Sequence, residues 1–253
     1  MKKIAVITGA SSGMGKQFLE TLQDYGSFDE VWAVARRKDL LDSLKAFCPV
    51  RSVPVDLTDP LSFEVYRKLL EEEKPSVDLL INASGYGKFD AVTDTALSDN
   101  LGMIDLNCKA VAAMCQLTIP YMPKGASIIN IASASSFQPV PYICIYGATK
   151  AFILNYSRAL NQELKDVHVM ALCPFWVKTD FFNRAVGDNP VVKKYIVMYD
   201  PESIVKKAWK DVKKKKDVSI YGLVAKGQIF LVKHLPHGFV MKTWMKQQGM
   251  KAK

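Results

Sequence analysis

Three side chains near the middle of the chain could carry out proton transfer. Tyr146 and Lys150 are four residues apart in the segment YGATK, at the start of a predicted helix, so both project from one face. An ammonium group beside a phenol favours the phenolate, so we expect Lys150 to lower the pKa of Tyr146 toward the neutral range. A tyrosine tuned in this way is a usable proton donor and acceptor. Ser133 lies 13 residues upstream, at the end of a predicted strand.

A second pattern, near the N-terminus, is suited to binding phosphate. Residues 8–15 read TGASSGMG and lie between a predicted strand and a predicted helix. Gly9, Gly13 and Gly15 permit a tight turn and a close approach of the backbone to a pyrophosphate, and the helix N-terminus directs unpaired N–H groups at it. The context of strand, turn and helix favours dinucleotide binding.

The end of the next strand indicates which dinucleotide is bound. An Asp or Glu there accepts from the adenosine ribose, whereas arginine can receive a 2′-phosphate. The sequence has Ala35-Arg36-Arg37-Lys38, with no acid before Asp39. This favours NADP(H) over NAD(H); the alternative is a solvated loop. Asp56, after the third strand, either accepts from the adenine amino group or caps the next helix.

These residues must be held by a regular framework of strands and helices. The first two-thirds of the chain repeats a short β-branched apolar run, a turn and a stretch of helical period, which predicts a parallel sheet covered by helices on both faces. We expect strands at 4–7, 31–35, 50–55, 77–82, 127–131 and 167–172, and helices at 15–25, 40–47, 61–73, 101–121 and 146–164.

The pattern changes after Pro174. Residues 181–199 are typical of a loop or flap, 202–214 of a helix and 218–221 of a final edge strand. Apolar and aromatic residues at 228–232 and 239–245 then alternate with lysines, as in a basic amphipathic helix. Such a helix can lie on an anionic bilayer, or dock on its own domain or on a dimer mate.

Composition and charge exclude several classes of protein. The chain has 253 residues, 49% apolar and 23% charged, which is ordinary for a globular protein with one large core. The net charge of +9 lies in the last part: residues 1–180 hold 18 basic and 20 acidic side chains, and residues 181–253 hold 16 and 5. The lysine run 213–216 lacks any motif that reads bases, so nucleic acid is not an expected partner.

Cysteine usage and the N-terminus point to an intracellular protein. The five cysteines include no C-x-x-C pair, so neither a disulfide framework nor a zinc site is expected. The N-terminal apolar run is too short for a signal peptide, and no run is long enough to span a membrane. We expect a cytoplasmic protein without metal, resting at the inner membrane surface if its basic segment binds lipid.

Taken together, these residues resemble the classical short-chain dehydrogenases/reductases over essentially the whole chain. The elements that match in order and near the family's spacing are the turn 8–15, Asn82 to Gly85, Asn107, Ser133, and Tyr146 with Lys150. The resemblance implies an α/β fold: one Rossmann-type, doubly wound parallel sheet of about seven strands, with helices on both faces. A single domain would then span 1–253, with 1–180 as the cofactor-binding and catalytic core and 181–253 as the substrate loop and basic extension.

The resemblance also implies roles for the residues that match the family's motifs. Tyr146 would be the general acid in carbonyl reduction and the base in alcohol oxidation, Lys150 would hold the nicotinamide ribose, and Ser133 would orient the substrate oxygen. Asn107 would hold a water that relays protons through Lys150, unless it is a helix-interior amide bonded to nearby backbone. The implied NADP(H) contacts are Gly9, Ser11, Ser12, Gly13, Met14, Gly15, Arg36, Arg37, Asp56, Leu57, Asn82, Ala83, Ser84, Tyr146, Lys150, Pro174, Val177 and Thr179.

Two positions depart from the family pattern. Phe175 stands where the family has a glycine after the proline, and the usual Asn-Asn-Ala-Gly reads Ile81-Asn82-Ala83-Ser84-Gly85. Both concern the cofactor loops rather than the proton-transfer residues.

The substrate pocket of the family is built mainly from the segment after the sixth strand. Here that segment contains Phe175, Trp176, Phe181, Phe182, Val191, Val192, Tyr195, Ile196 and Met198. This aromatic density favours a bulky apolar carbonyl such as a steroid or lipid ketone, since large hydrophobes gain about 25 cal/mol per Å² buried. The alternative is that these residues only cover the sheet. Expected substrate contacts are Ser133, Tyr146, Phe175, Trp176, Phe181 and Tyr195.

The sequence therefore predicts an NADP(H)-dependent oxidoreductase that interconverts a carbonyl and a secondary alcohol, similar to hydroxysteroid dehydrogenases and carbonyl reductases. A catalytically idle, cofactor-sensing binding protein and a reductase of small or ketoacyl carbonyls are the alternatives. A nucleotide-sugar epimerase would need a larger substrate domain, and an enoyl reductase a longer Tyr-to-Lys spacing. A homo-oligomer, dimeric or tetrameric, is expected by the same resemblance.

Overall fold

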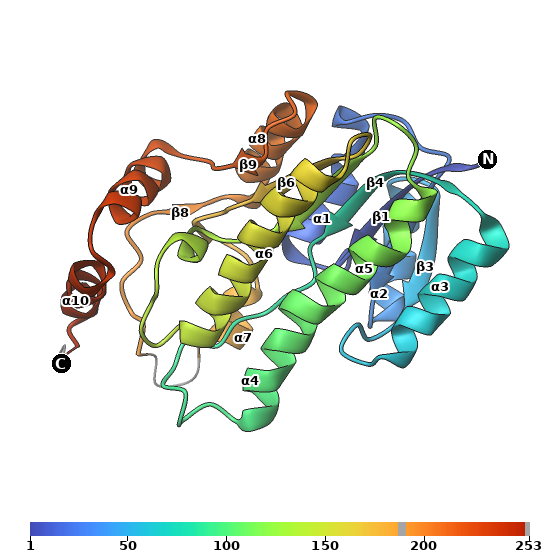
Figure 1. Ribbon diagram of the computed structural model, residues 1–253. Coiled ribbons are helices and arrows are strands. Elements are labelled where there is room, and N and C mark those ends of the chain that lie inside the picture. The colour runs from blue at the N-terminus through green and yellow to red at the C-terminus, as the bar shows by residue number, and fades with distance from the viewer. Residues whose placement is uncertain (187–190, 251–253) are drawn as a thin grey trace.

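The centre of the molecule is a seven-stranded parallel sheet, seen in a computed structural model that describes residues 1–186 and 191–250 (Figure 1). Its strands lie in the order β3-β2-β1-β4-β5-β6-β9. Their bounds are β1 (Lys3–Thr8), β2 (Glu30–Ala35), β3 (Val50–Pro54), β4 (Ser76–Asn82), β5 (Ser127–Ile131), β6 (His168–Leu172) and β9 (Val218–Ser219). The strand order reverses between β1 and β4, and a doubly wound sheet of this kind binds its ligands at the carboxyl ends of these two strands.

Helices cover both faces of the sheet, as predicted. They are α1 (Gly13–Glu20), α2 (Lys38–Ser43), α3 (Leu61–Glu73), α4 (Leu97–Ile104), α5 (Ala110–Thr118), α6 (Cys144–Glu163) and α8 (Pro201–Lys213). Alternate residues of β1 point to opposite faces: Ile4 and Val6 join the core under α3, α5 and α6, and Ala5 and Ile7 join the core under α1, α2 and α8. The predicted fold class is confirmed.

The predicted helix over 101–121 is in fact four consecutive segments. α4 begins four residues earlier, at Leu97, and is joined to α5 by a π-helical turn over Asp105–Lys109; a 3₁₀ turn over Ile119–Tyr121 follows α5. A π-turn is a local departure from the α-helical hydrogen-bond ladder that hydropathy does not reveal, and it is often found near functional sites. The predicted helices over 15–25 and 40–47 likewise end in 3₁₀ turns, at Leu22–Asp24 and Leu44–Ala46.

The predicted flap over 181–199 contains regular structure. A short helix α7 (Phe181–Ala185) opens it, and the strand β8 (Met198–Tyr199) near its end pairs in parallel with β7 (Trp176–Val177). Residues 187–190 of the flap lie outside the described residues. The helix and edge strand predicted after the flap are confirmed as α8 and β9, although β9 is only two residues long.

The basic amphipathic segment forms two helices. α9 (Leu223–His234) and α10 (His237–Gln248) are separated at Pro236, which has no N–H to continue the ladder of α9. Both helices lie at the end of the molecule opposite β3 and α3 (Figure 1). Within residues 1–186 and 191–250, no helix has the length and apolar character needed to cross a membrane. The same residues contain no cluster of side chains suited to bind a metal ion.

Candidate active site

The carboxyl ends of the parallel strands open into a cavity of about 910 Å³. Its wall brings together the glycine-rich turn after β1, the ends of β2, β4 and β5, the N-terminal part of α6 and the segment after β6. The predicted cofactor residues in this wall are Gly9, Ser11, Ser12, Gly13, Met14, Arg36, Arg37, Asp56, Leu57, Ala83, Ser84, Tyr146, Lys150, Pro174, Val177 and Thr179. Segments far apart in the sequence therefore share one site.

The glycine-rich turn is shaped by close backbone contacts. A Cβ on Gly9, whose φ is 66°, would lie 2.8 Å from the amide nitrogen of Ser84, and a Cβ on Gly15 would lie 2.3 Å from the carbonyl oxygen of Gly9. Gly13 also has a positive φ, 53°, and begins α1. Only glycine fits these positions without moving the backbone. The result is a cradle with a helix N-terminus at its floor, which fits the pyrophosphate of a dinucleotide.

Two predicted cofactor residues lie behind this wall rather than in it. Gly15 is packed against Gly9, and Asn82 is buried between strands, where its Nδ2 donates to Asn130 Oδ1 at 2.8 Å. The junction of β1 and β4 is instead tied by Thr8, whose Oγ1 accepts from the amide nitrogens of Ala83 and Ser84, both at 3.1 Å. Gly15 and Asn82 therefore support the shape of the cradle from beneath.

The basic corner predicted after β2 lies at one end of the cavity. Arg37 Nη2 lies 3.4 Å from Ser11 Oγ, to which it donates, so Arg37 reaches back across the glycine-rich turn. Arg36 Nη1 lies 3.6 Å from Asp56 Oδ2. The two arginines thus have different partners, although both line the cavity.

Asp56 does not cap the helix that follows it. Its Oδ1 accepts from the backbone nitrogen and the hydroxyl of Thr58, at 3.0 and 2.8 Å, whereas α3 begins only at Leu61. Partial burial alone would raise the pKa of Asp56, but the two bonds from Thr58 and the charge of Arg36 lower it below the ordinary aspartate value. Asp56 is therefore an ionised acceptor in the cavity wall.

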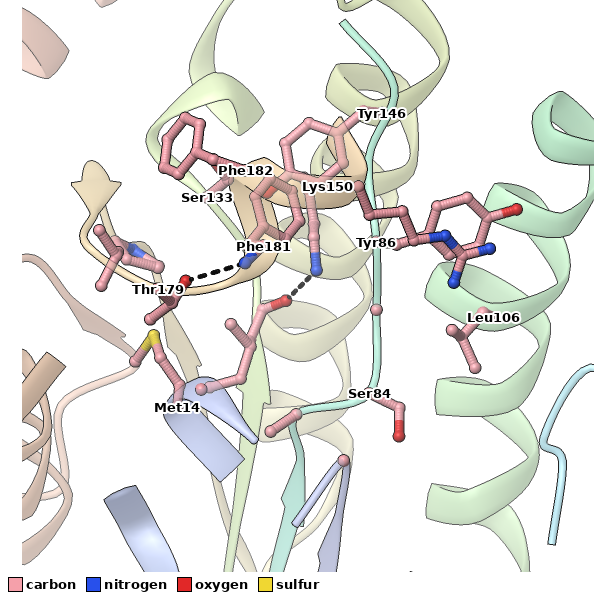
Figure 2. Close-up of a pocket in the computed structure, with 18 of the residues that line it drawn as sticks. Met14, Ser84, Tyr86, Leu106, Ser133, Tyr146, Lys150, Thr179, Phe181 and Phe182 are labelled. Atoms are coloured by element: carbon pink, nitrogen blue, oxygen red, sulfur yellow. Dashed lines mark hydrogen bonds between the residues drawn. The ribbon is translucent and has the colours of Figure 1, made fainter. Parts of the chain in front are cut away.

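The proton-transfer residues come from two neighbouring elements. Ser133 lies two residues after the end of β5 and has an extended backbone, and its Oγ accepts from the amide of Ser135 at 3.2 Å. Tyr146 and Lys150 lie on successive turns of α6, with Lys150 Nζ 5.7 Å from the Tyr146 ring centroid. Figure 2 shows the three gathered beside Phe181, with Met14 and Ser84 at the opposite end of the view. The predicted grouping of Ser133, Tyr146 and Lys150 in space is present.

The predicted direction of the Tyr146 pKa shift is wrong for the protein chain by itself. Burial raises the pKa of Tyr146 to about 12, and hydrogen bonding with Ser133 only partly opposes the rise. Burial also lowers the pKa of Lys150 to about 8. The reason is geometric: Lys150 Nζ donates to the carbonyl oxygen of Ile131 at 2.7 Å, so its charge is directed at backbone. In this enclosed site, desolvation outweighs the attraction that the sequence spacing suggested.

Asn107 lies behind the cavity wall, fully buried in the π-turn. Its Oδ1 accepts from the amide nitrogen of Tyr86 at 3.1 Å, and its Nδ2 donates to the Tyr86 carbonyl at 2.9 Å and to Thr149 Oγ1 at 3.1 Å. The side chain therefore fixes the segment after β4 to α6. These bonds match the alternative interpretation of Asn107 as an amide bonded to backbone, except that Tyr86 is 21 residues away in the chain. The role of Asn107 in holding a relay water stays a prediction.

The other end of the cavity is aromatic. Phe89 packs edge-on against Tyr146, with ring centroids 5.8 Å apart, and Phe181 lies 5.6 Å from Tyr146. Trp176 and Phe182 also line this end (Figure 2 labels Phe182). Phe175 lines the cavity as predicted, whereas Tyr195 packs behind it against Trp176 at 5.0 Å. The aromatic segment after β6 thus forms a pocket wall rather than only a cover for the sheet.

Several wall residues were not predicted from the sequence. They are contributed by the segment after β4, the loop before α6, α7 and α10, and include Phe89, Val140, Ile143, Arg184, Trp244 and Gln247. The position of Phe89 after the carboxyl end of a central strand was a usable signal. Trp244 had no such signal, because it reaches the cavity only through the docking of α10, where its Nε1 donates to the Pro141 carbonyl at 3.1 Å.

Comparison with known proteins places this geometry in a family. The model of the family described as short chain dehydrogenase matches residues 3–189. The human very-long-chain 3-oxoacyl-CoA reductase is 33% identical over 226 residues, which cover 82% of this chain and 68% of that protein.

Two solved structures share the fold over nearly their full length. A short-chain dehydrogenase from Sphingobium yanoikuyae in complex with NADPH has a TM-score of 0.76 and 27% identity, covering 92% of this chain and 96% of that one. The bulky-bulky ketone specific alcohol dehydrogenase from Comamonas testosteroni has a TM-score of 0.72 and 26% identity, covering 97% and 99%.

Proposed function

The chain belongs to the short-chain dehydrogenases, a family of oxidoreductases, and we propose that it interconverts a bulky apolar ketone and its secondary alcohol with NADP(H). One observation carries the proposal: Ser133, Tyr146 and Lys150 lie in the same cavity wall as a glycine cradle at one end and a group of aromatic side chains at the other. A dinucleotide and an apolar substrate placed at these two ends would meet beside Tyr146.

The chain's own residues would handle the proton and the positioning. Once bound, the cofactor supplies or accepts the hydride. Tyr146, with a pKa of about 12, holds its proton at neutral pH and donates it to the carbonyl oxygen during reduction. Ser133 donates a hydrogen bond to the same oxygen and thereby orients the substrate. In alcohol oxidation the phenolate form of Tyr146 accepts the proton of the hydroxyl, so Tyr146 must lose its own proton before this step. Lys150 would hold the ribose beside Tyr146, and Thr179 would hold the carboxamide.

The preference for NADP(H) is supported by the basic corner. Arg37 donates to Ser11 across the glycine-rich turn, so a cation and a hydroxyl lie together where a 2′-phosphate would sit. Arg36 adds a second positive charge to the wall, although Asp56 partly neutralises it. A carboxylate that would accept from a free 2′-hydroxyl is missing from the end of β2. The relative from Sphingobium yanoikuyae is in complex with NADPH, in agreement with the proposal.

The proposed substrate class rests on the aromatic end of the cavity. Phe89 and Phe181 pack against Tyr146 and offer apolar surface beside it. Trp176, Phe182 and Trp244 extend this surface. Ketones with large groups on both sides of the carbonyl would bury the most surface there. Two relatives agree in class, since their names specify bulky ketones and very-long-chain 3-oxoacyl-CoA. Because α10 contributes to the same cavity as the core, we also propose that the chain works as one domain.

The test is turnover, with Tyr146→Phe as the decisive variant. The purified chain should consume NADPH with keto-steroids or long-chain ketoacyl thioesters, and less efficiently with small aldehydes. Tyr146→Phe should lower kcat at least a hundredfold, in line with the loss of a general acid, and leave the Kd for NADPH within about twofold. Tyr156→Phe on the same helix is the matched control and should keep its activity. Turnover by Tyr146→Phe comparable to the native chain would refute the mechanism.

A further inference from the structure

Helix α9 has apolar side chains on both of its sides. Ala225, Ile229 and Val232 face the protein and are buried. On the opposite side Leu223, Phe230 and Leu231 are 86, 64 and 56% exposed. An ordinary surface helix is polar on its outer side, and a helix that is apolar all round is normally covered all round.

The exposed apolar side chains continue from α9 through the turn into the start of α10. Val224, Leu235 and Phe239 are exposed as well, and together with the three residues above they form what we call the outer patch: Leu223, Val224, Phe230, Leu231, Leu235 and Phe239. Single exposed apolar residues are common on proteins, but six within 17 consecutive residues form a surface suited to binding.

The charged side chains within the segment that carries the outer patch are all of one sign. After Asp217 the chain has six lysines and no Asp or Glu. Lys226 lies on α9, and Lys242 and Lys246 lie on α10, all exposed. None of the ion pairs among the described residues involves these three lysines, so their charges are free to act on an external anionic surface.

Charge decides which occupant fits this surface. A second copy of the chain packed on the same patch would bring two lysine-rich segments together without a carboxylate to pair them, and like charges in contact oppose association. An anionic lipid surface offers the opposite charge to the lysines and an apolar layer to the leucines and phenylalanines. We propose that the outer patch docks on an anionic lipid bilayer, with Phe230 and Leu231 inserted at the level of the head groups.

The docked face borders the active site. Gln228 of α9 and Trp244 and Gln247 of α10 line the cavity from the inner side of the same two helices. Docking would therefore bring one wall of the cavity to the membrane, where an apolar ketone is concentrated. This consequence for substrate supply rests on the proposed function; the docking itself does not.

Vesicle flotation tests the docking directly, without any turnover. The full chain should float with vesicles of equal parts phosphatidylglycerol and phosphatidylcholine, and bind at least tenfold more weakly to phosphatidylcholine alone. High salt should weaken the binding, because the lysines act by screened charge. Tyr146→Phe should bind as the native chain does, so the result is independent of catalysis. Failure of the native chain to bind the anionic vesicles would overturn the proposal.

Matched variants separate the outer patch from net charge. Leu223→Glu with Phe230→Glu should lower vesicle binding at least tenfold. Leu61→Glu with Val65→Glu, on the exposed side of α3 at the other end of the molecule, makes the same change in charge and should lower it far less. Unchanged thermal melting and NADPH binding would show that both variants are folded. Equal losses of vesicle binding in the two variants would overturn the proposal. It would also be overturned if the native chain self-associated, and Leu223→Glu with Phe230→Glu abolished that self-association but left vesicle binding intact.

A kinetic comparison tests the supply of substrate. With anionic vesicles present, the native chain should show a lower KM for a bilayer-dissolved ketone than the Leu223→Glu, Phe230→Glu variant. The ratio of the two KM values should be about the ratio of their affinities for the vesicles. Turnover of a water-soluble ketone should be the same in both. Absence of turnover with every ketone would contradict the proposed function and leave the flotation result standing. Equal KM values for the bilayer-dissolved ketone would contradict the supply of substrate through the docked face.

Discussion

Lys150 Nζ donates a 2.7 Å hydrogen bond to the carbonyl oxygen of Ile131, the last residue of β5. The bond anchors the ammonium group to the sheet at a buried position, between the catalytic helix α6 and the strand that leads to Ser133. It holds the side chain in one place, but a single carbonyl does not compensate for lost hydration, and the pKa of Lys150 falls to about 8.

The first prediction concerns the pH dependence of carbonyl reduction. Tyr146, with a pKa of about 12, is protonated throughout the neutral range, so the group that titrates there is Lys150. Lys150 is charged below about pH 8 and loses its charge as the pH rises. We expect kcat/KM for NADPH, which reports groups of the free enzyme, to be level from about pH 6 to 8 and to fall above it.

Lys150→Arg is the control for this assignment. Arginine keeps its charge throughout this range, so the residual activity of the variant should lack the fall above pH 8. A fall at the same pH in Lys150→Arg would assign the titration to another group.

The second prediction separates the two arginines after β2. Arg37 lies against Ser11, whereas Arg36 is paired with Asp56. A charge-assisted hydrogen bond is worth about 1.5–3 kcal/mol, so Arg37→Ala should raise the Kd for NADPH by about 10- to 140-fold and leave the Kd for NADH nearly unchanged. Arg36→Ala should have the smaller effect, and Arg36→Asp should shift preference toward NADH. Both affinities are measured by titrating cofactor fluorescence; equal weakening of NADPH and NADH by Arg37→Ala would contradict contact with the 2′-phosphate.

The third prediction concerns the glycine cradle. In Gly15→Ala the new Cβ would lie 2.3 Å from the Gly9 carbonyl oxygen, so the turn has to move. We expect a loss of about 1–3 kcal/mol in the free energy of unfolding, as for other overpacked sites, and weaker NADPH binding. Gly26→Ala is the control, because its Cβ would meet no described atom within 4 Å. The free energy of unfolding in urea and the Kd for NADPH should therefore change in Gly15→Ala and not in Gly26→Ala. Native values of both quantities in Gly15→Ala would contradict the prediction, because they would show that the turn accommodates a Cβ at little cost.

The fourth prediction concerns Trp244, which α10 brings into the cavity wall. Its ring stacks on Trp176 with centroids 6.4 Å apart, and both extend the aromatic end of the site. Trp244→Ala should lower kcat/KM for bulky ketones by about tenfold or more, since apolar contact area is lost, and change it little for small aldehydes. Phe239→Ala on the exposed side of α10 should leave both values unchanged in solution. A uniform loss for all substrates in Trp244→Ala would indicate damage to the site rather than a specificity role.

Much of this protein follows from local features of its sequence. The strands are apolar on both faces because helices cover both sides of the sheet, so the continuous apolar runs locate β1, β4 and β5 within about one residue. Helix α3 has the bounds that its periodicity predicts. The glycine-rich turn and the Tyr146–Lys150 spacing are likewise set within a few residues of chain.

What only the tertiary structure decided depends on segments that are distant in the chain. The side-chain amide of Asn107 hydrogen-bonds to Tyr86 and Thr149. Trp244 enters the cavity because α10 docks beside Pro141. The apolar residues of α9 are divided between a buried side and an exposed one. The reversed pKa shift of Tyr146 has the same origin. A four-residue spacing shows that a lysine and a tyrosine share a helix face, but the cost of desolvation depends on everything that encloses them, and that enclosure exists only in the folded chain.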